Sequence, residues 1–150
     1  SDTEILLIRH TYPNLFILPY YSIENYFFHP DNLEEYFQTR QQPFDKSLYV
    51  KNLTACKEKN KDFILMGIIS ARSSYPFFRE HEHAKLRQQF LENARSILEL
   101  LQSDDVETFY QVFPAKDYCR QLLERQNLSK EKLSQTEWFK GQVRSCLFRE

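Results

Sequence analysis

Glycine is almost absent from this chain, in which Gly67 and Gly141 are the two glycines among 150 residues and average usage gives about ten. The shortage leaves no glycine-rich loop that could hold phosphate groups, which disfavours the P-loop and Rossmann classes of nucleotide-binding protein. It also leaves few positions for tight turns. The composition therefore favours a helical protein.

Cysteine is scarce as well. Cys56, Cys119 and Cys146 lie far apart in the sequence, and no pair has the spacing of metal ligands. Since three cysteines cannot complete a disulfide framework, we expect reduced thiols in a cytoplasmic protein. No apolar run approaches the ~20 residues needed to cross a bilayer, and we expect no membrane partner.

An excess of charge is missing too, because 20 Lys and Arg face 21 Asp and Glu. The charges are unevenly spread, however. Residues 22–36 hold four acids and no Lys or Arg, whereas residues 116–150 hold more basic than acidic side chains. This split is compatible with a nucleic-acid groove beside a metal site, and also with ordinary solvated helix faces.

Aromatic residues are plentiful, with 13 Phe and 9 Tyr, and the apolar spacing is mostly helical. It predicts a helix over residues 2–12, one after Ser22 that restarts at Pro30 and runs to about Gln41, and one after Asp45 that ends in the polar run 57–61. A separate helix over residues 63–73 is expected to be buried on most sides. Further helices are predicted over residues 78–102, 103–112, 115–126 and 129–147.

A short apolar run, Leu15–Leu18, differs from the rest because buried strands have this pattern. A helix followed by such a strand is typical of an α/β crossover whose other strands would lie upstream of Ser1. The expected fold is mainly α, a bundle of about six helices carrying a remnant strand and helix of an α/β core. We place the remnant at residues 1–21 and the helical domain at residues 22–150.

Glu24 is the first candidate site residue. It follows Ser22, a good N-cap, and a carboxylate at this position interacts well with the free N–H groups and dipole of a helix. The same position, after a strand, can also direct an acid at a divalent cation such as Mg²⁺. Asn25 could cap the turn or orient water.

Two sequence blocks carry a resemblance. Leu18-Pro19-Tyr20-Tyr21-Ser22-Ile23-Glu24-Asn25-Tyr26-Phe27, followed by Pro30 and Leu33, resembles the signature of an uncharacterised bacterial domain family. That family is related to the TOPRIM nucleases of the overcoming-lysogenization-defect class and often accompanies AAA-type ATPases. The second block, Phe113-Pro114-Ala115-Lys116-Asp117, is similar to a Pro-Gly-Lys-Asp-like segment of the family, with Ala115 in place of the usual glycine.

The resemblance implies a Mg²⁺-dependent protein that cuts or binds nucleic acid, in phage defence with an ATPase partner. It makes Glu24 an additional acid and metal ligand of the site and Lys116 a basic partner that neutralises phosphate charge. Asp104-Asp105 is not the Asp-x-Asp pair of such a site, which should lie upstream, so this chain alone should be inactive. The alternative for Lys116 is a solvated residue near a helix start.

Other interpretations remain open. His81 and His83 could bind a metal from an extended loop, but on a helix residues two apart do not converge. The tyrosines and phenylalanines of residues 20–28 could stack on bases, although such clusters are more often core. The helices could instead form a non-catalytic interaction module that docks an ATPase or forms a homo-oligomer, or a plain scaffold. A solvent-facing Glu24 beside other acids favours the nuclease, and Glu24 in a helix cap with an apolar surface patch favours the module.

Overall fold

The computed structural model describes residues 18–73 and 83–147. These two ranges form eight helices and no strand, so the mainly α class is confirmed. Three of the helices, α2, α7 and α9, have only four or five residues. In chain order the helices are α2 (Ile23–Phe27), α3 (Pro30–Thr39), α4 (Lys46–Ser73), α6 (His83–Gln102), α7 (Val106–Phe109), α8 (Ala115–Arg125), α9 (Lys130–Leu133) and α10 (Glu137–Leu147).

The predicted strand receives no support from its described part. Leu18 is not in a strand, and residues 19–22 form bends that lead into α2. Residues 15–17 and the predicted helix over residues 2–12 lie outside the described ranges. The chain before α2 is nevertheless tied to the helices, because the Tyr21 N–H donates to the Tyr110 carbonyl at 3.1 Å.

Several helix starts follow from local chemistry. Pro30 occupies the first turn of α3, where its fixed φ is suitable and its missing N–H costs nothing. His29 caps this helix, since its Nδ1 accepts from the Asp31 N–H at 3.1 Å. Pro114 directly precedes α8, as predicted. Ser22 and Ser129 occupy the N-cap positions of α2 and α9, but neither side chain makes a capping hydrogen bond.

The prediction of two helices over residues 46–73 was wrong, because α4 is one helix of 28 residues. The polar run 57–61 does not interrupt it, since Lys, Glu and Asn are tolerated in a helix and no proline is present. The expectation that the second half is buried on most sides was also wrong. Phe63 and Met66 are 77% and 62% exposed, while Ile64 and Ile68 face the core.

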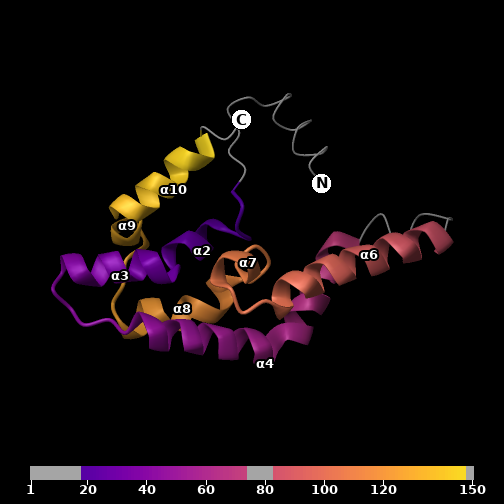
Figure 1. The fold of residues 1–150 in the computed structure, drawn as a ribbon, viewed down its shortest axis with the longest axis horizontal. Coiled ribbons are helices and arrows are strands. Elements are labelled where there is room, and N and C mark those ends of the chain that lie inside the picture. The colour runs from indigo at the N-terminus through magenta and orange to yellow at the C-terminus, as the bar shows by residue number, and fades with distance from the viewer. Residues whose placement is uncertain (1–17, 74–82, 148–150) are drawn as a thin grey trace.

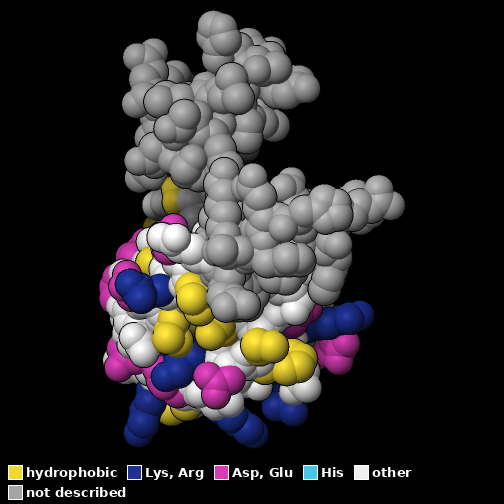
Figure 2. Space-filling model, turned by 90° about the vertical axis from the view of Figure 1, so that its right-hand side faces the viewer, with side chains coloured by type: hydrophobic (Ala, Val, Ile, Leu, Met, Phe, Trp, Pro, Cys, Tyr) yellow, Lys and Arg dark blue, Asp and Glu magenta, His cyan; other side chains and the backbone are white. Residues whose placement is uncertain are grey.

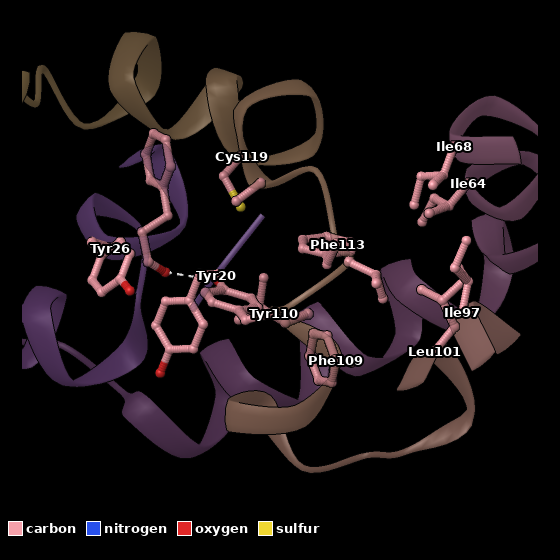
Figure 3. Close-up of a cluster of buried hydrophobic side chains, with 14 of the residues drawn as sticks. Tyr20, Tyr26, Ile64, Ile68, Ile97, Leu101, Phe109, Tyr110, Phe113 and Cys119 are labelled. Atoms are coloured by element: carbon pink, nitrogen blue, oxygen red, sulfur yellow. Dashed lines mark hydrogen bonds between the residues drawn. The ribbon is translucent and has the colours of Figure 1, made fainter. Parts of the chain in front are cut away.

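Two clusters of apolar side chains hold the helices together. In the larger cluster, aromatic residues around α2, α7 and α8 continue into the α4–α6 contact, where Ile64 and Ile68 meet Ile97 and Leu101 (Figure 3). The smaller cluster joins α3 to α9 through Leu33, Tyr36, Phe37 and Leu133. Burying a side chain of this size contributes roughly 1.5–3 kcal/mol.

The arrangement places α4 and α6 apart from the remaining helices at one end. The two pack against each other and extend to the right in Figure 1, away from the group formed by α2, α3 and α8–α10. The other end of α4 lies against α3 and α8, where Tyr49 and Leu53 join the cores. The N-terminal part of α4 is therefore surrounded by other helices, whereas the C-terminal part has α6 on one side.

Candidate functional site

Glu24 lies in the first turn of α2, with 14% of its side chain exposed and its Oε1 3.6 Å from the Lys130 Nζ. Burial by itself raises the pKa of Glu24. The Glu24 backbone N–H, the Ser22 hydroxyl and the cations of Lys130 and Lys116 outweigh that effect and hold the pKa below its ordinary value. The side chain is therefore a carboxylate at neutral pH, held in the helix cap between cations.

Lys116, the second predicted site residue, is exposed in the first turn of α8. Its charge acts on Glu24, so the structure brings the two predicted residues into one neighbourhood although 92 positions separate 24 from 116 in the sequence (116 − 24). Lys130 belongs to the same neighbourhood but was not predicted from the sequence. It comes from α9, and no local motif marks it.

Asn25 explains why these residues meet. Its side chain is fully buried, and its Nδ2 donates to the carbonyls of Tyr110 at 2.8 Å and Phe113 at 2.6 Å. Its Oδ1 accepts from the Ala115 N–H at 3.3 Å and the Ser22 hydroxyl at 3.0 Å. Asn25 therefore ties the first sequence block to the second through internal hydrogen bonds, instead of orienting water.

Glu24 does not belong to a metal-binding type of cluster in the described part of the chain. Within the described ranges, the His, Cys and carboxylate side chains that converge closely enough to share one ion are His29, Asp31 and Glu107, and Glu24 does not belong to that group. Mg²⁺ is normally held by carboxylates, water and substrate phosphate. The neighbourhood of Glu24 supplies one carboxylate and two cations, so the described residues do not by themselves form a magnesium site.

The group around His29 is internally satisfied. The His29 ring is 2% exposed; its Nε2 donates to Glu107 Oε1 at 2.6 Å, and its Nδ1 is occupied by the helix cap. Burial lowers the pKa of His29, and the bond to Glu107 partly opposes this. The Tyr20 hydroxyl donates to the other Glu107 oxygen, and burial raises the pKa of this tyrosine.

This arrangement does not suit a metal. A ligating His29 nitrogen needs a free lone pair, and each nitrogen already has a hydrogen-bond partner. Asp31 also has a partner, because its Oδ1 lies 2.6 Å from the Lys46 Nζ. Trp138 stacks on the His29 ring at 4.5 Å between ring centroids. The group therefore connects α3, α7 and α10 by packing and hydrogen bonds. The segment Glu80-His81-Glu82 lies outside the described ranges.

Lys57 is a buried cation, and no sequence pattern marks it. Its side chain is 0% exposed and its Nζ donates to the Ser103 carbonyl at 2.7 Å. The same ammonium contacts carboxylates of Asp104 at 2.9 Å and Glu58 at 2.9 Å, and lies 5.2 Å from the Phe109 ring centroid. These partners account for its donors and fix the α6–α7 connection against α4.

Comparison with protein-family models, curated proteins and solved structures gave no match to this chain. The resemblance to TOPRIM-like proteins therefore stays a prediction from the two sequence blocks. Among the described helices, none is both long and apolar enough to cross a membrane.

Proposed function

We propose that the described helices form a non-catalytic interaction module, the helical C-terminal part of a TOPRIM-like, nuclease-related protein. The observation that carries the proposal is the outward face of α4, which presents Phe63 and Met66 to solvent at 77% and 62% exposure. Figure 2 looks at the end to which α4 and α6 extend, and hydrophobic side chains gather there among charged ones. Exposed apolar side chains that gather in a patch mark protein-binding surfaces, whereas single ones are ordinary.

The surroundings of Glu24 support the same proposal. An acid that serves phosphoryl transfer acts with a metal ion and other carboxylates. Here the carboxylate is mostly buried, sits in the first turn of α2 and faces Lys130 and Lys116. These contacts stabilise the junction between α2, α8 and α9, and they need no substrate. The chain alone should therefore have no nuclease activity.

The resemblance supplies the wider setting. From this resemblance we propose that the intact protein cleaves nucleic acid with Mg²⁺, acts in phage defence and has an AAA-type ATPase partner. In that setting the module joins the nuclease-related core to another protein chain, and α4 is the helix that makes the contact.

A second candidate function is favoured by one specific observation. The ionised Glu24 lies between two cations, Lys116 and Lys130, close to the point where the chain enters α2. With acids from other parts of an intact protein, Glu24 could hold Mg²⁺ while the two lysines bind nucleic-acid phosphates. In that case the same three side chains belong to a cleavage site.

Measuring Mg²⁺-dependent cleavage of DNA and RNA by the intact protein separates the two candidates. The matched pair is Glu24→Gln and Glu131→Gln, since Glu131 is an exposed acid of α9 next to Lys130. For the interaction module, both variants keep the cleavage rate of the natural protein. A loss of cleavage confined to Glu24→Gln, with stability changed by no more than about 1 kcal/mol, the scale of a capping change, supports the cleavage site instead.

Assembly with a protein partner is the complementary measurement. We expect Phe63→Glu to prevent the intact protein from assembling with its ATPase or with itself, as measured by light scattering, while Glu24→Gln assembles normally. If the Phe63→Glu variant still assembles both with the ATPase and with itself, the proposed function is contradicted.

A further inference from the structure

The solvent-facing side of α4 is one continuous stripe. Exposed residues recur at three- and four-residue steps from Leu48 to Ser70, which is the spacing of one helix face. At 1.5 Å per residue this stripe is about 35 Å long. Its middle contains Ala55, Glu58, Lys59, Asp62, Phe63 and Met66. None of the described helices covers it, because α6 packs on the opposite side through Ile64 and Ile68.

Gly67 leaves one position beside this stripe without a side chain, directly after the exposed Met66. Glycine in a helix interior is unfavourable, and this chain avoids glycine almost everywhere. A Cβ added at Gly67 would meet no atom within 4 Å. The space beside Gly67 is therefore open, as it is beside Gly141. A second helix can approach this end of the stripe without a steric clash.

The charges on the stripe are complementary to themselves. Lys59 and Asp62 are both exposed and have opposite charge, and within the described ranges neither forms an ion pair with its own chain. If two copies of α4 pack antiparallel about a point midway between these residues, each Lys59 lies opposite Asp62 of the second copy. One two-fold axis then forms both pairs, as in an isologous dimer.

The same register accommodates the exposed apolar side chains. Ala55, Glu58, Lys59 and Asp62 stand at positions i, i+3, i+4 and i+7, which is the four-residue hole that receives a knob in helix packing. On the other copy, Met66 reaches this hole beside the small Ala55, and Phe63 packs at its edge, next to Lys59. Met66 and Ala55 then lie at the same height on the two copies.

We propose that this face of α4 is a homodimer interface in which two copies pack antiparallel, with Lys59 of each copy opposite Asp62 of the other and Met66 opposite Ala55. This proposal rests on the proposed function, because it names the partner of the interaction module as a second copy of the chain. The apolar and small residues fix the position of contact, and the charges fix its register and direction.

Sedimentation equilibrium of the 150-residue chain tests the proposal. We expect reversible dimerisation at concentrations up to about 1 mM, which covers weak association. Lys59→Asp and Asp62→Lys should each weaken the dimer by at least about tenfold, since each places like charges opposite each other twice. The double variant carrying both changes restores the opposite charges and should recover the original affinity within about threefold.

The controls keep the result interpretable. Lys132→Asp changes an exposed lysine of α9 and should leave the dimer unchanged, and circular dichroism confirms that every variant folds. A chain that stays monomeric, or a double variant no better than the single ones, overturns the inference. If the chain is monomeric and Phe63→Glu still prevents assembly with the ATPase, the homodimer is wrong and the interaction module stands.

Discussion

Removing the side chain of Asn25 should be among the most destabilising changes available in this protein. Asn25→Ala deletes two donated bonds, to the carbonyls of Tyr110 and Phe113, and two accepted bonds, from Ala115 and Ser22. The two carbonyls each keep one other partner, from the N–H groups of Tyr21 and Ala115. Asn25→Ala therefore leaves neither carbonyl unpaired, and the full desolvation penalty of a buried carbonyl is not added to the cost.

The magnitude follows from these contacts. Each buried hydrogen bond contributes about 1 kcal/mol net, and the space left at a fully buried site adds a cavity term of about 1 kcal/mol. The free energy of unfolding should fall by about 3–5 kcal/mol, a large part of the 5–15 kcal/mol typical of a domain. Asn25→Asp should be at least as damaging, because a carboxylate oxygen replaces the group that donates to two carbonyls.

Urea unfolding provides the assay, followed by fluorescence of Trp138, the one tryptophan of the chain, which packs beside Tyr26 and His29. Asn93→Ala is the matched control, since Asn93 is exposed on α6 and its loss should change stability by no more than about 0.5 kcal/mol. If Asn25→Ala costs no more than Asn93→Ala, Asn25 does not join the two sequence blocks in the way described.

Three further predictions concern His29, Lys57 and the two glycines. Burial lowers the pKa of His29 in the folded protein, so the histidine of the unfolded chain, with a pKa of about 6.5, takes up a proton first as the pH falls. The stabilising contribution of neutral His29 is therefore complete above that pH and declines as the pH falls toward the lowered pKa of the folded state. Urea titrations at several pH values should show this decline, and His29→Asn, which keeps a capping group, should remove that part of the pH dependence. Lys57→Ala should cost about 1.5–3 kcal/mol in thermal unfolding, since it removes the buried charged donor to the Ser103 carbonyl while Glu58 and Asp104 stay exposed to water. Lys61→Ala, an equal truncation at the more exposed Lys61–Glu58 pair, should cost less than about 1 kcal/mol. Equal losses contradict the buried position of Lys57. Gly67→Ala and Gly141→Ala should each raise the free energy of unfolding by about 0.5–1 kcal/mol, as measured by urea unfolding, because an added Cβ meets no neighbouring atom at either position.

Much of the helical framework could be predicted from local sequence. Pro30 and Pro114 mark helix starts for steric reasons, and the spacing of Leu33, Tyr36 and Phe37 correctly placed them in the core. Such features depend on neighbours within one or two turns. The continuity of α4 was missed because a polar run resembles a break, although it is also compatible with a long helix.

The neighbourhood of Glu24 could be predicted in part. The two sequence blocks named Glu24 and Lys116, and the fold does bring them together. Lys130 could not be found, and neither could the internal bonds of Asn25 or the burial of Lys57. Each depends on a partner from another helix, up to 106 positions away in the case of Lys130 (130 − 24), and no local pattern records such a pairing.

The outward face of α4 carries the central claim, and the chain offers a probe placed on it. Met66 is the single methionine of the chain, so a spectrum of protein labelled with ¹³C at the methionine methyl contains one signal from this face. We predict that the signal shifts and broadens as protein concentration rises, and that Phe63→Glu abolishes the change. A signal that keeps the same position and width at every concentration, in both proteins, contradicts the account.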